Sequence, residues 1–187
     1  GNSGVILSQL WRGFARAVDN KATLDVPTTV QAFAAARDTA YKGVVRPVEG
    51  TILTVAKDVA AAAEKAQSVT DDPGALLEIL VNAADRSVQH TPELLPVLKE
   101  AGVVDSGGKG LFFILEGMLR FIQGQPLDAT TTAVLPLSEM ILENTMEAIE
   151  PGQDFEVIVD FRPTEPLELA EFYGELEQMG TSIQVGE

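Results

Sequence analysis

The sequence predicts a mainly α-helical fold, an antiparallel helical barrel or bundle, followed by a partial α/β segment of strand, helix and strand. Apolar residues recur at intervals of three and four along most of the first 125 residues, the period of a helix with one buried face. The turns between these stretches are short, and alternation with a period of two begins only after residue 150. We therefore divide the chain into a helical domain (1–125), a partly helical connector (126–150) and the start of a second, α/β domain (151–187).

The first two helices are predicted from apolar stripes and a start signal. The first stripe consists of Leu7, Leu10, Trp11, Phe14 and Val18. We interpret its two aromatic residues as core rather than as part of a cofactor site. The second helix begins at Asp25-Val26-Pro27-Thr28, because proline suits a first helical turn. Its apolar face holds Val30, Phe33, Ala34 and Tyr41.

Four further helices follow in the helical domain. The segment Thr51–Val69 is rich in alanine, which permits close packing between helices. The turn at Asp71-Asp72-Pro73-Gly74 starts a helix that runs to about Val88, and we interpret its aspartates as capping residues rather than a metal pair. Thr91-Pro92-Glu93 predicts a separate helix start. The last helix covers Lys109–Gln123.

The single histidine, His90, stands just before the predicted start at Thr91. We interpret it as a solvent-facing turn residue, with a general base as the alternative.

The pattern changes near Glu150-Pro151-Gly152. The segment Phe155–Phe161 alternates with a period of two and predicts a strand. A helix follows from Glu165-Pro166 to about Met179, and Thr181–Val185 predicts a second strand. One strand–helix–strand unit cannot cover both faces of a sheet, so it is interpreted as the start of a larger domain.

Composition limits the classes of partner. With 13 basic and 28 acidic residues the net charge is −15, which disfavours nucleic acid and anionic lipid. A nucleotide triphosphate would need a divalent metal and backbone donors; a merely soluble acidic surface is the alternative. No apolar run approaches the roughly 20 residues of a membrane span. The absence of cysteine excludes disulfides and fits a reducing, cytoplasmic compartment.

Three segments place Gly, Ser or Thr at a helix start, where backbone N–H groups can bind phosphate. They are Gly1–Gly4, Gly50-Thr51 and the stretch Asp105–Gly110, in which Lys109 adds positive charge. Each has an ordinary alternative: a capped helix start, or a tight turn with a solvated lysine. Because helices packed side by side can gather such ends, the three together predict one anion site.

These segments resemble the nucleotide-binding (L-subunit-like) domain of the dihydroxyacetone kinase family. The resemblance rests on Gly1–Gln9, Glu49–Val55 and Gly102–Gly110, and it covers about residues 1–125. More narrowly, the chain is similar to the multidomain branch that includes bacterial fatty acid kinase, which phosphorylates fatty acids held by DegV-like carrier proteins. The segment Leu176–Ser182 is similar to the start of that branch's middle domain.

The resemblance implies an all-helical barrel that binds ATP and Mg²⁺ at one end. It is also compatible with a homodimer. The residues that match the family's nucleotide segments are Gly1, Asn2, Ser3, Gly4, Gly50, Thr51, Ile52, Asp105, Ser106, Gly107, Gly108 and Lys109. The family's acidic magnesium-binding loop falls upstream of Gly1. No catalytic residue and no metal ligand is therefore assigned in this chain, and we expect the chain alone to be inactive.

Two alternatives remain open at this point. Dihydroxyacetone kinases carry an arginine where Thr91-Pro92 aligns, which favours the fatty acid kinase branch or a different phosphate contact. A stand-alone dihydroxyacetone (glycerone) kinase subunit is nevertheless the second reading. The third is a non-catalytic helical module whose acidic face docks a partner protein.

Overall fold

The computed structural model describes residues 2–127, 157, 159, 161–164, 166–180 and 183. They belong to two compact units, one that ends at Leu127 and one that begins at Val157 within this described part. Each unit is considered by itself below.

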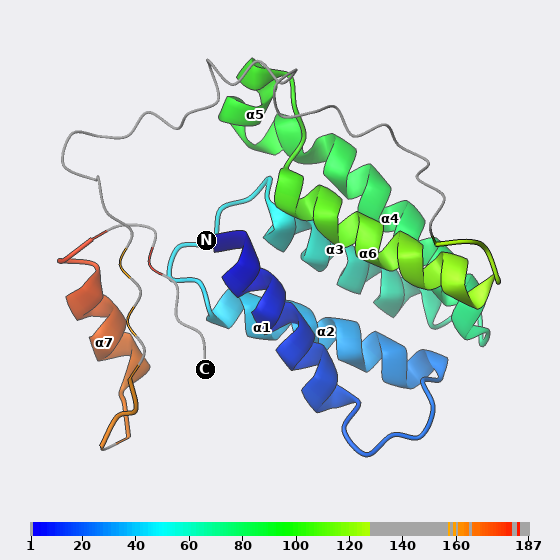
Figure 1. The fold of residues 1–187 in the computed structure, drawn as a ribbon, viewed down its shortest axis with the longest axis horizontal. Coiled ribbons are helices and arrows are strands. Elements are labelled where there is room, and N and C mark those ends of the chain that lie inside the picture. Colours follow the sequence, from blue (N-terminus) through cyan, green and yellow to red (C-terminus); the bar gives the residue numbers. More distant parts are fainter. Residues whose placement is uncertain are drawn as a thin grey trace. The chain divides into compact units, whose positions relative to one another are not determined.

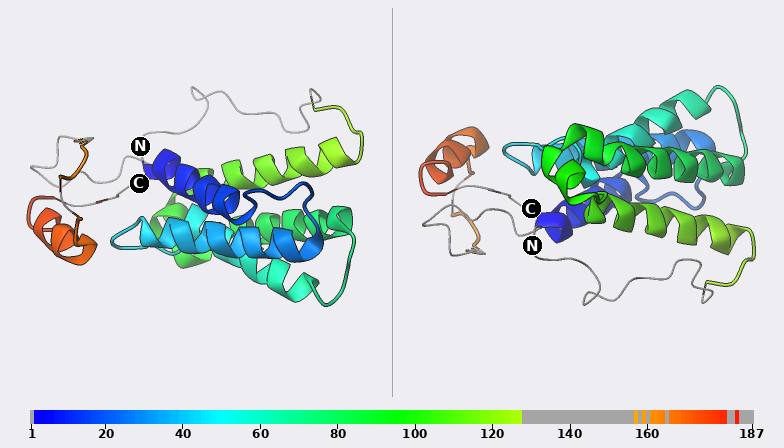
Figure 2. Two further views of the ribbon diagram at one scale, coloured as in Figure 1. Left: turned by 90° about the horizontal axis from the view of Figure 1, so that it is seen from below. Right: turned by 90° about the horizontal axis from the view of Figure 1, so that it is seen from above.

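The first unit is a bundle of helices, which confirms the mainly α-helical prediction. The helices are α1 (Asn2–Ala17), α2 (Val26–Lys42), α3 (Ile52–Ala66), α4 (Pro73–Leu94), α5 (Pro96–Ala101) and α6 (Ser106–Ile122). Helix α1 pairs with α2, α2 packs on α3, and α3 and α4 both contact α6 (Figure 1). Figure 2 shows the same bundle from two further directions. Closure of these helices into a barrel stays a prediction.

Aspartate side chains begin three of the helices, α2, α4 and α6. Asp25 accepts the backbone N–H of Thr28, and Asp72 accepts that of Ala75, each at 2.8 Å. Both residues have extended backbone, as capping residues do. The capping interpretation of Asp72 is thereby confirmed.

The core is formed by the apolar faces of the five longer helices. Its fully buried large side chains include Leu53, Leu76, Leu80 and Leu115. The alanines of α3 act as predicted: Ala60 and Ala63 have no exposed surface. On α1, the ring of Phe14 lies edge-on to Trp11 and to Phe33, with centroids 5.5 and 5.3 Å away. These aromatic residues serve packing, as expected.

Helices α1 and α2 cross closely at Gly13. A Cβ atom added there would lie 2.5 Å from the backbone oxygen of Ala35 and 2.5 Å from Thr39 Oγ1. Such distances are well inside van der Waals contact, so only glycine fits this crossing.

The predicted helix start at Thr91-Pro92 is wrong, because α4 continues through Pro92 to Leu94. Proline has no N–H for the carbonyl oxygen of Val88, which normally ends a helix. Here the hydroxyl of Thr91 donates to that same oxygen at 2.7 Å and replaces the missing bond. The next helix, α5, begins after Leu95.

His90 consequently lies within α4 and not in a turn. Its Nδ1 is 3.0 Å from a carboxylate oxygen of Glu93, and about half of its side chain is exposed.

In the second unit, α7 (Leu169–Leu176) confirms the predicted helix over a shorter range. The rings of Phe161 and Phe172 pack at 5.8 Å between centroids. The two predicted strands fall largely outside the described residues, and the described Val157 and Val159 belong to no strand. The connector at 126–150 also lies almost entirely outside them. Within the described part of the chain, no helix is both long and apolar enough to cross a membrane.

Candidate functional site

The N-terminal ends of α1, α3 and α6 meet at one place in the bundle. A Cβ position built at Gly107 lies 3.2 Å from Ser3 Oγ of α1 and 3.4 Å from Cβ of Ile52 in α3. Ser3 is exposed and Gly107 is partly exposed, so this place opens to solvent. We call it the meeting point. The structure thus brings together one residue from each of the three segments that the sequence singled out.

Asp105 provides the negative charge at the meeting point. Its Oδ2 accepts the backbone N–H of Gly108 at 2.6 Å, which caps α6, and it lies 3.3 Å from the Cβ position of Gly107. Burial raises the pKa of the Asp105 carboxyl above its ordinary value, and the backbone N–H groups of Gly108 and Ile52 offset only part of that rise. One carboxylate therefore faces the starts of both α6 and α3.

This charge determines where a second anion fits. An incoming phosphate would be repelled at the N–H groups that Asp105 already faces. Helix α1 has no acidic residue in its first turn, and Asn2, Ser3 and Gly4 are exposed. Its positive dipole end and its serine hydroxyl are therefore the part of the meeting point that suits an anion.

In the turn before α3, the polar groups cap the helix, which is the ordinary alternative to phosphate binding. Thr51 Oγ1 accepts the N–H of Leu53 at 3.4 Å and donates to the carbonyl oxygen of Val48 at 2.8 Å. The N–H of Gly50 donates to Thr54 Oγ1 at 2.8 Å. Thr51 is thus an N-cap, and the residue of this segment that reaches the meeting point is Ile52.

Gly50 is required there for two reasons. Its φ of +86° is in the left-handed region, and an added Cβ would lie 2.7 Å from Cβ of Leu95. The turn therefore packs directly against the junction of α4 and α5.

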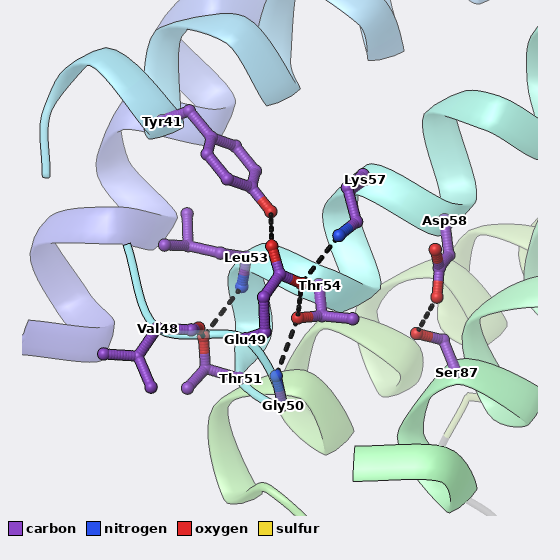
Figure 3. Close-up of polar contacts among 10 residues, drawn as sticks. All are labelled: Tyr41, Val48, Glu49, Gly50, Thr51, Leu53, Thr54, Lys57, Asp58 and Ser87. Atoms are coloured by element: carbon purple, nitrogen blue, oxygen red, sulfur yellow. Dashed lines mark hydrogen bonds and ion pairs between the residues drawn. The ribbon is translucent and has the colours of Figure 1, made fainter. Parts of the chain in front are cut away.

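Sequence reasoning missed a polar group beside this turn, which we call the Glu49 cluster (Tyr41, Glu49, Thr54 and Lys57; Figure 3). Glu49 Oε2 accepts from Lys57 Nζ at 2.6 Å and from Thr54 Oγ1 at 2.7 Å, and Oε1 accepts from Tyr41 at 3.3 Å. The hydrogen bond from Lys57 is the main cause that lowers the pKa of Glu49. Burial first, and then the charge of Glu49, raise the pKa of Tyr41 to about 12. Helix α2 supplies one member and α3 two, a pairing that no local pattern indicates.

The remaining predicted residues differ in their positions. Lys109 Nζ lies 3.6 Å from Asp85 on α4 and 4.1 Å above the ring of Phe112, so its charge is directed to α4. Gly108 is buried, where a Cβ would lie 2.7 Å from Cγ2 of Val55. Ser106 is exposed. Gly1 lies outside the described residues.

No group of three or more His, Asp or Glu side chains among the described residues could hold a metal ion. The described part of the chain does provide helix starts that suit an anion.

Comparison with known proteins identifies the family of the helical unit. A family model described as the DAK2 domain matches residues 1–120. An uncharacterized protein of Staphylococcus haemolyticus is 44% identical over 160 residues, which is 86% of this chain and 27% of that protein. An uncharacterized protein of Staphylococcus aureus is 41% identical over 193 aligned positions, 99% of this chain and 35% of its own length. The chain thus spans about a third of the length of these relatives.

Proposed function

We infer, because the chain belongs to the DAK2 domain family, that it is the nucleotide-binding domain of an ATP- and Mg²⁺-dependent kinase. The observation that supports this most directly is the meeting point, where the Cβ position of Gly107 lies within 3.4 Å of both Ser3 and Ile52 from the other two helix starts. Phosphoryl transfer needs positioned donors more than a covalent residue, and the start of α1 offers such donors at the place where the other two helix starts converge.

Each helix end has its own role in this proposal. The first turn of α1, with the hydroxyl of Ser3, binds the phosphates. The absence of a side chain at Gly107 leaves room for the nucleotide to approach the backbone of α6. The Asp105 carboxylate fixes the starts of α3 and α6 in register. Bound Mg²⁺ would neutralise charge between the phosphates and this acidic surface.

For the acceptor, we propose a fatty acid presented by a DegV-like carrier protein. The similarity of Leu176–Ser182 to the middle domain of that kinase branch supports this choice over dihydroxyacetone. Because the relatives are about three times as long as this chain, the activity belongs to the whole protein, and the chain alone would be inactive.

Calorimetry with ATP and Mg²⁺ on the full-length protein tests nucleotide binding. Gly107→Val should weaken the affinity by roughly tenfold or more, because its side chain would fill the space beside Ser3. Gly110→Val is the matched control: it lies in the same helix with nothing within 4 Å of its Cβ position. Equal affinities for the two variants would contradict the site.

A kinase assay on the full-length protein tests the acceptor. Phosphate transfer to fatty acid in the presence of a DegV-like carrier, and not to dihydroxyacetone, is the expected result. Transfer to dihydroxyacetone alone would favour the glycerone kinase reading.

One observation favours the non-catalytic interaction module as a second candidate. On α6, the apolar side chains of Phe113, Met118 and Phe121 are exposed. If full-length protein with Gly107→Val loses nucleotide binding and yet keeps its cellular role, the interaction module becomes the better reading.

A further inference from the structure

We propose that Glu49 is a positioning residue for the nucleotide site, because it holds the turn that places the start of α3 at the meeting point. This inference rests on the proposed function. Glu49 itself does not lie at the meeting point, so it would act through the backbone of residues 49–52.

Glu49 ties the end of α2 to the beginning of α3. Its carboxylate accepts from Tyr41, near the end of α2, and from Thr54 and Lys57, in the first two turns of α3 (Figure 3). Two of these three distances are 2.7 Å or less, the range of charge-assisted hydrogen bonds. Since one carboxylate receives all three donors, the two helix ends cannot separate without breaking the group.

The connection continues from Thr54 to the meeting point. The hydroxyl that donates to Glu49 also accepts the N–H of Gly50, at 2.8 Å. Gly50 is confined in turn, because its Cβ position lies 3.1 Å from the backbone oxygen of Thr91. Two residues later, Ile52 contacts the position of Gly107. A displaced Glu49 would therefore move the wall of the site.

Because the ion pair between Glu49 and Lys57 is exposed, a role in positioning the turn can be distinguished from a role in stabilising the fold. The side chains of Lys57 and Glu49 are 43% and 47% exposed, and an ion pair this exposed contributes little to the stability of a fold. Loss of the pair should consequently leave the protein folded while it loosens the turn.

The experiment measures ATP affinity, with Mg²⁺, in the full-length protein by calorimetry. Glu49→Gln and Lys57→Met should each weaken binding by roughly two- to fivefold, the size of effect that the loss of an exposed ion pair can produce. Lys57→Arg should restore affinity close to that of the unchanged protein. In the free variants, hydrogen exchange should become faster at the first-turn amides of α3 and remain unchanged in the middle of α4.

Ser87→Ala is the matched control. It removes a 2.6 Å hydrogen bond to Asp58, which joins α3 to α4 without involving the Gly50 turn (Figure 3). This variant should lower the melting temperature and keep the nucleotide affinity.

The outcomes are distinguishable. If the unchanged full-length protein binds no nucleotide, the proposed function fails. If it binds nucleotide, and folded Glu49→Gln and Lys57→Met bind equally well, only the role of Glu49 is overturned. An equal loss of affinity in Ser87→Ala would also overturn it, since stability alone would then explain the effect. If Glu49→Gln fails to fold, the ATP affinities of Lys57→Met and Lys57→Arg test the role of Glu49 in its place.

Discussion

The hydroxyl of Thr91 accepts a hydrogen bond from the backbone N–H of Asp105 at 3.0 Å, which joins the end of α4 to the residue that caps α6. The same hydroxyl donates to the carbonyl oxygen of Val88, and the side chain has no exposed surface. One buried threonine thus carries α4 past its proline and fixes the turn that presents Asp105.

Replacing Thr91 with valine tests this arrangement. Valine keeps the shape and removes both hydrogen bonds, so the free energy of unfolding should fall by about 1–3 kcal/mol. Urea denaturation of Thr91→Val measures the loss. Thr91→Ser keeps the hydroxyl and should lose less; a larger loss for serine than for valine would contradict the hydrogen-bond explanation.

Gly13→Ala should destabilise the bundle. The added methyl group would lie 2.5 Å from Thr39 Oγ1, and overpacking of this kind costs about 1–3 kcal/mol. Gly117→Ala in α6 is the control, because nothing lies within 4 Å of its Cβ position. It should stabilise by up to about 1 kcal/mol, since alanine favours a helix over glycine. Thermal melts of the two variants should therefore shift in opposite directions.

Alanine substitutions at Gly50 and Gly102 distinguish the energetic cost of backbone strain from that of steric contact. Both have positive φ, +86° and +66°, so alanine should cost roughly 1 kcal/mol at either position. Only Gly50 is crowded, by Cβ of Leu95 at 2.7 Å. The loss of stability in Gly50→Ala should exceed that in Gly102→Ala, by about 1–3 kcal/mol for the added overpacking. Equal losses in chemical denaturation would show that the turn can move away from Leu95.

Stability should depend on pH through Asp105. Because the pKa of its carboxyl is raised in the folded state, the folded protein binds this proton more tightly than the unfolded chain does. Its contribution to stability is complete below the unfolded pKa and is lost as pH rises through the folded pKa. An asparagine side chain at this position would cap the helix equally well without titrating. From about pH 3 to about pH 7, Asp105→Asn should therefore gain stability relative to the unchanged protein.

Paired denaturation curves for Asp105→Asn and the unchanged protein, recorded across that range, give the comparison. A difference that moves in favour of the unchanged protein as pH rises would contradict the raised pKa.

The helices could be predicted from the sequence where the signal is local. Asp25 before Pro27, and the alanines of α3, act within one or two turns of the chain, and the structure places them as expected. The prediction at Thr91-Pro92 is wrong because it uses only the local pattern, which is that of a helix start. The Thr91 hydroxyl replaces the hydrogen bond that is lost at Pro92, and its second partner, Asp105, lies fourteen residues away.

In the candidate site, too, the local features could be predicted from the sequence and the contacts between helices could not. Glycine and serine at helix starts indicated Ser3 and Gly107, although not which of their neighbours would face each other. The Glu49 cluster depends on the angle between α2 and α3, because Tyr41 reaches Glu49 across a loop. Sequence spacing carries no information about that angle. Lys109 was placed near phosphate by its charge, whereas its ion pair with Asp85 is decided by the approach of α6 to α4.

The unequal anchoring of the three helix starts has a consequence for motion. Capping bonds and the Gly50 turn fasten α3 and α6 to the end of α4, whereas α1 packs mainly on α2. Because α2 packs on α3 and is tied to it through Glu49, a movement of the first turn of α1 alone would widen or narrow the space beside Ser3 while the opposite wall stays fixed. A ligand bound there would therefore lie between a movable start of α1 and a fixed wall formed by the starts of α3 and α6.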